Sequence, residues 1–149
     1  MEIEYILVAI FISFWWGISP IILKGLVTKF NVMTIMVLEG IMYFVLVILL
    51  GIKYYDTIVT DMKRVNTRDW AMMFLTAVIG GFIANVIYMK LLEKHDSYII
   101  TALVSISPFF TLVLAYSFTK EKVTALGALG TIFIVFGILM ISYNDKGFL

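Results

Sequence analysis

Two long apolar runs near the C-terminus are separated only by the charged tripeptide Lys120-Glu121-Lys122. Neither Ser97–Thr119 nor Val123–Asn144 contains an Asp, Glu, Lys or Arg residue. At a rise of about 1.5 Å per residue, each run forms a helix more than ~30 Å long, which is the hydrocarbon thickness of a bilayer. Because so short a turn makes the two helices antiparallel neighbours, the pattern predicts a pair of adjacent transmembrane helices.

The composition of the whole chain agrees with a membrane location. Hydrophobic residues make up 62% and charged residues 14% of the 149 positions, whereas charged residues are about 25% of a typical soluble domain. A formal net charge of +1, without any basic block, argues against a nucleic-acid partner. The chain has no cysteine and one histidine, so we expect no disulfide, no metal site and no cofactor.

Apolar runs and the charges that flank them predict an all-α membrane protein, with five transmembrane helices in a single domain over residues 1–149. The predicted spans cover about residues 5–24, 32–51, 70–90, 97–119 and 123–144. We therefore expect an integral, multi-pass protein that contacts the lipid bilayer and acts within it.

The one sizeable loop, residues 52–68, is not expected to be wholly irregular. Apolar residues recur in it at helical spacing, namely Ile52, Tyr55, Val59 and Met62. This spacing favours a short helix lying at the membrane interface. Thr67 is the expected N-cap of the third span.

Lysine and arginine residues are almost evenly divided between the two sides of the membrane. The side that holds the N-terminus has six, namely Lys53, Lys63, Arg64, Arg68, Lys120 and Lys122. The far side has five, namely Lys24, Lys29, Lys90, Lys94 and Lys146. So small a difference is compatible with a weak N-in preference or with insertion in both orientations. Since an odd number of spans inverts a second copy joined end to end, it also fits the inverted-repeat plan of many transporters.

Several motifs resemble those of one transporter family. They are Phe14-Trp15-Trp16-Gly17 with Lys24, Thr67-Arg68-Asp69-Trp70, Ser105-Ile106-Ser107-Pro108, the turn Phe118-Thr119-Lys120-Glu121-Lys122-Val123-Thr124, and the glycines Gly130 and Gly137. Together they resemble the EamA domain of the drug/metabolite transporter superfamily, and the resemblance covers the whole chain. Because family members usually carry two five-helix domains, it implies a half-size transporter that pairs with itself or with a related half-transporter. The chain departs from the family pattern at Glu39, where a basic residue is expected.

Polar residues inside the predicted spans define a candidate substrate or ion pathway. Its members are Trp16, Pro20, Glu39, Asn85, Tyr88, Thr101 and Ser105. Counted along the helices, four of the spans place such a group at a depth of about 6–12 Å from the far side, which predicts a polar vestibule opening there. Two alternatives remain open: the hydroxyls can bond to their own helix carbonyls, and Pro20 can be an ordinary packing kink.

Glu39 is the only acidic residue inside the predicted spans. An ionised acid there costs at least ~2.5 kcal/mol, so it requires a reason. It is a candidate proton carrier or cation-binding group; alternatively, it forms a structural ion pair with Lys24 or Lys90, or reaches the far surface. Gly127, Gly130 and Gly137 are expected to be helix-packing positions.

Two hypotheses for the function follow. The first is a secondary transporter subunit that moves a small organic solute by alternating access, as a homodimer that can be antiparallel. The alternative is a non-transporting scaffold or regulatory subunit of another membrane protein. An enzyme is not expected, because the sequence offers no nucleophile–base or metal constellation.

Overall fold

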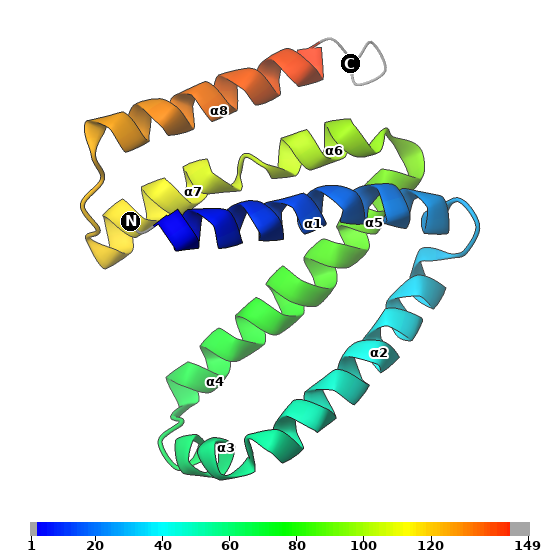
Figure 1. Ribbon diagram of the computed structural model, residues 1–149, viewed down its shortest axis with the longest axis vertical. Helices are drawn as coiled ribbons and strands as arrows, with labels where there is room; N and C mark the ends of the chain where they lie inside the picture. The colour runs from blue at the N-terminus through cyan, green and yellow to red at the C-terminus, as the bar shows by residue number, and fades with distance from the viewer. Residues whose placement is uncertain (1–2, 144–149) are drawn as a thin grey trace. The chain divides into compact units, whose positions relative to one another are not determined.

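The structure, a computed structural model, describes residues 3–143, and these form helices without any strand (Figure 1). Five helical spans within this range are long and apolar enough to cross a bilayer, namely Ile3–Val27, Val32–Lys53, Thr67–Lys94, Ser97–Thr119 and Ala125–Tyr143. The predicted all-α fold class with five transmembrane helices is therefore confirmed. The third span is longer at both ends than expected, and the fifth begins at Ala125 rather than at residue 123. The expected end of the fifth span, at residue 144, lies outside the described residues.

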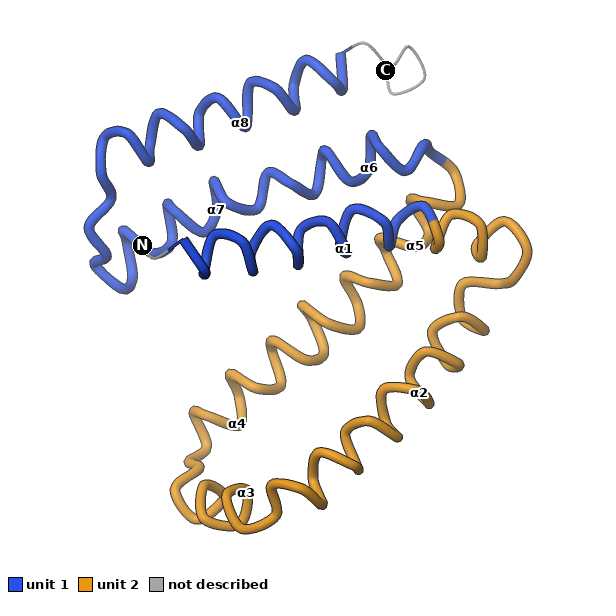
Figure 2. Tube along the Cα trace, viewed as in Figure 1, with its two compact units in different colours: residues 1–21, 95–149 blue, residues 22–94 orange. Residues whose placement is uncertain are grey.

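The chain divides into two compact units, coloured separately in Figure 2. Unit 1 consists of residues 1–21 and 95–149, and unit 2 consists of residues 22–94. The first helix, α1 (Ile3–Val27), begins in unit 1 and ends in unit 2. A single domain over residues 1–149 stays a prediction.

Unit 1 contains the greater part of α1 and the last two spans. Its other elements are α6 (Ser97–Val104), α7 (Ser107–Leu114), η2 (Ala115–Thr119) and α8 (Ala125–Tyr143). α8 packs against both α6 and α7. The buried apolar residues of this unit are Ile99, Ile100 and Ile138, while most other apolar side chains are exposed. Exposed apolar side chains suit a helix surface that acyl chains cover.

The fourth span is broken near its middle. α6 ends at Val104 and α7 begins at Ser107, with Pro108 in the first turn of α7. Proline has no backbone N–H and its ring clashes with the carbonyl four residues earlier, here that of Val104. Around the break the backbone forms hydrogen bonds across three residues instead of four. The Ile106 N–H donates to Leu103 O at 3.2 Å, and the Phe109 N–H donates to Ile106 O at 2.9 Å.

The turn between the last two spans is held by local hydrogen bonds. η2 ends at Thr119, and the next residue, Lys120, caps it with a φ of 56°, in the left-handed region. The Thr119 hydroxyl donates to Glu121 Oε1 at 2.9 Å, so this acid helps to hold the turn. Thr124 Oγ1 accepts from the Gly127 N–H at 3.1 Å. This hydroxyl therefore caps the N-terminus of α8, which begins at Ala125.

Unit 2 contains the end of α1 and the second and third spans. Its elements are α2 (Val32–Lys53), α3 (Tyr55–Met62), α4 (Thr67–Phe74), η1 (Leu75–Ile83) and α5 (Ala84–Lys94). α2 packs against α5. The buried residues are Leu23, Val27, Val32, Ile35, Met89 and Leu92. They belong to the end of α1, the start of α2 and the end of α5, so the core of this unit lies at one end of its long helices.

Two sequence-based expectations for the long loop have different outcomes. The short helix expected within residues 52–68 is confirmed as α3. The expected N-cap, Thr67, is wrong, because Asn66 takes this position. The Asn66 side chain accepts from the N–H groups of Arg68 and Asp69, and the Asp69 carboxylate accepts from the Asn66 N–H at 3.0 Å. This reciprocal capping box satisfies more backbone groups than a threonine one residue later could.

Candidate functional site

Unit 2 has a pocket of ≈ 420 Å³ between α2 and the third span. It is lined by Met36, Glu39, Gly40, Tyr43, Gly81, Phe82 and Asn85. On each helix the lining residues recur three or four positions apart, so they share one helix face. The structure thus brings together two of the predicted pathway residues, Glu39 and Asn85. The volume lies in the range of about 300–1,000 Å³ that small-molecule sites occupy.

The third-span wall of this pocket is not a regular α-helix. Gly81 and Phe82 belong to η1, a π-helical stretch, and at its end the Ala84 N–H donates to Ile79 O, five residues back. The Thr76 hydroxyl donates to the carbonyls of Met72 and Met73, at 3.1 and 3.0 Å. π-Helical turns are rare and are found frequently at functional sites. Here the wider winding occurs where the third span faces Glu39.

Glu39 and Asn85 make no hydrogen bond or ion pair with any residue between 3 and 143. The interior N–H groups of a helix already bond to carbonyls, so α2 itself offers the Glu39 carboxylate no backbone donor. In hydrocarbon such a group is costly unless it is neutralised. The Glu39 carboxylate therefore requires a proton, a cation or a donor that this part of the chain does not supply.

The two lysines predicted as ion-pair partners of Glu39 lie elsewhere in unit 2. Lys24 Nζ donates to the Leu92 carbonyl at 2.6 Å, which ties the end of α1 to α5. Lys90 lines a separate pocket with Ile87, Leu91, Glu93 and Lys94. Tyr88 is half-buried and is not among the residues that line the Glu39 pocket. The structure forms no ion pair between Glu39 and either lysine within residues 3–143, and a pathway role for Tyr88 stays a prediction.

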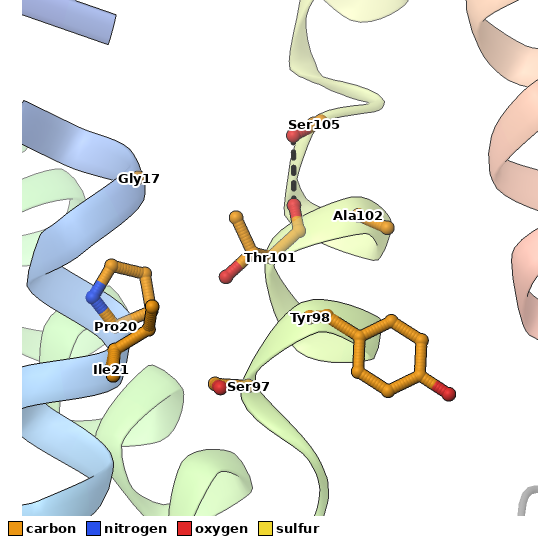
Figure 3. A pocket seen from close by; sticks show the side chains of 8 residues that line it. All are labelled: Gly17, Pro20, Ile21, Ser97, Tyr98, Thr101, Ala102 and Ser105. Atoms are coloured by element: carbon orange, nitrogen blue, oxygen red, sulfur yellow. Dashed lines mark hydrogen bonds between the residues drawn. The ribbon is translucent and has the colours of Figure 1, made fainter. Parts of the chain in front are cut away.

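Unit 1 has its own pocket, of ≈ 390 Å³, between α1 and α6 (Figure 3). It is lined by Gly17, Pro20, Ile21, Ser97, Tyr98, Thr101, Ala102 and Ser105. In Figure 3 the Pro20 ring faces the side chains of Ser97 and Thr101. Since Pro20 lacks an N–H, the carbonyl four residues earlier, that of Trp16, loses its usual helical partner. Three predicted pathway residues, Pro20, Thr101 and Ser105, therefore share this pocket.

The hydroxyl of Ser105 is satisfied within its own helix. Ser105 Oγ donates to Thr101 O at 2.8 Å, the dashed line of Figure 3. For Ser105 the structure therefore has the back-bonding arrangement that the sequence left open as an alternative. Trp16 is 71% exposed and does not line this pocket, so a pathway role for it stays a prediction. A vestibule shared by all four spans also stays a prediction.

The glycines of the last span have open surroundings. A Cβ atom at Gly130 or Gly137 would meet no heavy atom within 4 Å, and one at Gly127 would meet Thr124 Oγ1 at 3.1 Å. Among the described residues nothing approaches Gly130 or Gly137 closely. Their role in helix packing stays a prediction, and its partner would have to come from outside this part of the chain.

Three aromatic residues line the pockets although the sequence analysis did not single them out: Tyr43, Phe82 and Tyr98. A signal was present, because Tyr43 follows Glu39 by four residues and Phe82 precedes Asn85 by three. Residues at these spacings share a helix face. Aromatic residues are so frequent in this chain, however, that the spacing alone does not distinguish a pocket wall from a lipid-facing surface.

Comparison with known protein families identifies the chain. The model of the EamA-like transporter family matches residues 3–143, which is nearly the whole sequence. The chain belongs to the EamA-like transporter family. The resemblance seen in the sequence motifs is thereby confirmed, and this EamA-like chain is an integral, multi-pass membrane protein.

The EamA-like chain also resembles an uncharacterized protein of Methanocaldococcus jannaschii. The two are 24% identical over 140 residues, which cover 94% of this chain and 97% of the relative. The alignment therefore spans nearly the full length of both chains. No solved structure matches the chain.

Proposed function

We propose that this EamA-like chain is the subunit of a secondary transporter that moves a small organic solute by alternating access. The observation that carries the proposal is an unpartnered carboxylate, Glu39, facing a pocket of ≈ 420 Å³ inside a chain of a transporter family. A costly charged group within a membrane span is usually retained for binding or coupling. A single carboxylate in a largely apolar pocket inside a bilayer serves solute binding better than it serves helix packing.

The working form in this proposal is an antiparallel homodimer. Five spans leave the termini on opposite sides of the membrane, and the flanking basic residues number six against five. A second copy in the opposite orientation would create the inverted repeat on which alternating access depends in many transporters. The open surroundings of Gly130 and Gly137 leave room on α8 for close approach by another helix.

Orientation is the property that tests the dimer. A reporter that reads its compartment is attached to Leu149 and, in a separate fusion, to Met1. We expect each terminus on both sides of the membrane, because the positive-inside bias is nearly absent. A population with uniform orientation would contradict the antiparallel homodimer and would require an oppositely oriented partner chain.

Matched charge variants make this experiment sharper. Replacing Lys53, Lys63 and Arg64 by Gln leaves three basic residues on the N-terminal side against five on the far side. Replacing Lys29 and Lys94 by Gln leaves three on the far side against six. We expect the two variants to insert in opposite orientations and each to lose dimers when expressed alone. Crosslinked dimers should return when the two variants are expressed together. Dimers of equal yield in each variant alone would contradict the proposal.

A further inference from the structure

We propose that the pocket lined by Glu39, Tyr43 and Phe82 binds a monovalent organic cation with an apolar body. The inference rests on the transporter function proposed above and names the class of solute. It is drawn from unit 2 alone, because all seven lining residues belong to that unit. Three properties of the pocket carry it: its charge, the chemistry of its walls and its space.

The charge of the pocket favours a cation. Glu39 is the only charged residue among those that line it, and its carboxylate makes no hydrogen bond or ion pair within residues 3–143. The Asn85 amide and the Tyr43 hydroxyl line the same pocket but make no hydrogen bond to Glu39, so the carboxylate is stabilised most by a positive charge brought to it. An anionic solute would add a second negative charge beside it, and a neutral apolar solute would leave it unpaired.

The walls of the pocket favour an organic rather than a metal cation. Tyr43 and Phe82 supply aromatic rings, and Met36 supplies a polarizable thioether. Ring faces attract a cation whose hydration is weak, and the attraction is stronger where water is excluded. A divalent metal ion instead requires six or more oxygen ligands. One carboxylate, one amide and one phenol do not provide such a shell.

The space of the pocket suits a solute with a body as well as a charge. Glycines stand at positions 40 and 81, and a Cβ at Gly40 would meet no heavy atom within 4 Å. The wall is therefore recessed beside the carboxylate. Asn85 adds an amide that has both donors and an acceptor free for a polar substituent.

The test is equilibrium binding of radiolabelled benzyltrimethylammonium to the purified full-length protein in nanodiscs. We expect saturable binding that unlabelled benzyltrimethylammonium displaces and that benzenesulfonate, an aromatic solute of opposite charge, does not. Glu39→Gln removes the charge at nearly constant size and should weaken binding at least tenfold. The matched control is Glu93→Gln. Glu93 is a carboxylate of the third span that lines a different pocket of unit 2, so this variant should bind the cation like the wild type.

A second variant keeps the inference falsifiable if Glu39→Gln changes folding. Tyr43→Leu removes one ring and leaves the charge, and it should weaken binding about 2- to 30-fold. The absence of saturable binding to the wild type, equal displacement by benzenesulfonate, or unchanged affinity in a folded Glu39→Gln protein would each overturn the inference. Unchanged affinity in Tyr43→Leu would overturn the part of the inference that assigns the aromatic wall to cation binding.

Flux measurements in proteoliposomes separate this inference from the proposed function. Glu39-dependent binding without any flux of the cation would support the site and count against transport. Flux that persists in Glu39→Gln at the wild-type rate would support transport and overturn the site. Binding and flux that are lost together in Glu39→Gln, and kept in Glu93→Gln, would support both.

Discussion

The pockets of the two units are both built from transmembrane helices, yet their polar side chains are in opposite states. In unit 1 the Ser105 hydroxyl donates to the Thr101 carbonyl one turn earlier. In unit 2 the Glu39 carboxylate and the Asn85 amide have no partner among residues 3–143. The difference lies in what a helix offers to its own side chains. Its carbonyls accept a hydroxyl proton, but its interior N–H groups are occupied, so a carboxylate finds no donor.

Whether a polar side chain has a hydrogen-bond partner therefore indicates a binding site better than its polarity alone does. Hydroxyls that bond back to the backbone make little demand on their surroundings, and they serve helix packing as well as any pathway. A carboxylate in the same environment is stabilised only by something from outside its own helix. Of the two pockets, the one in unit 2 therefore carries the stronger indication of a bound solute.

Placing a carboxylate in the pocket of unit 1 should change the stability of the protein most. Ser105→Asp places a carboxylate in a transmembrane span on a helix whose interior N–H groups are already bonded, and we expect a loss of about 2.5–3.5 kcal/mol in stability. The unfolding midpoint in a detergent titration measures it. Ser105→Asn, which has similar size and no charge, is the control and should lose much less. A fully stable Ser105→Asp protein would show that water already fills this pocket.

Removing the unpartnered Glu39 carboxylate from unit 2 should increase the stability of the protein. Glu39→Met replaces it by an apolar side chain of similar length, and we expect a gain of about 1–3 kcal/mol in stability together with lost cation binding. The same titration measures the gain. A loss of stability would instead support the predicted structural ion pair. A double-mutant cycle with Lys24→Met or Lys90→Met would then identify the partner.

The two prolines offer a smaller test of how unit 1 is built. Pro108 interrupts the fourth span, whereas α1 continues through Pro20. Pro108→Ala restores an N–H that can reach the Val104 carbonyl, and we expect α6 and α7 to join with a gain of about 0.5–1.5 kcal/mol. Hydrogen exchange should then show protection of the amides around residue 106. Pro20→Ala is the control and should leave exchange in the fourth span unchanged.

The smallest effect should come from the hydroxyl itself. Ser105→Ala removes a bond that only connects the helix to itself, and we expect a change of about 0.6 kcal/mol or less in stability. Binding of benzyltrimethylammonium should be unchanged. If binding fell as far as in Glu39→Gln, the distinction between the two pockets would be wrong, and both would belong to the solute site.

Much of this arrangement could be predicted from the chain alone. The number and type of the spans follow from apolar runs whose lengths match a bilayer, and the α3 helix follows from apolar spacing within a charged loop. Glu39 and Asn85 were recognisable because polar side chains are rare in hydrocarbon. The capping residue of the third span was misplaced, because Asn66 and Thr67 are both good caps and only the reciprocal bond from Asp69 favours Asn66.

The sequence by itself determined that this is a five-span membrane protein of one transporter family, with Glu39 as the single acid inside the predicted spans, since length, hydropathy and charge are local properties. Tertiary structure decided which polar residues share a pocket. It placed Glu39 with Asn85 and Tyr43, and Pro20 with Thr101 and Ser105, while Trp16 remained exposed. The physical reason is that helical periodicity fixes which residues share a face, whereas packing between helices fixes which faces meet.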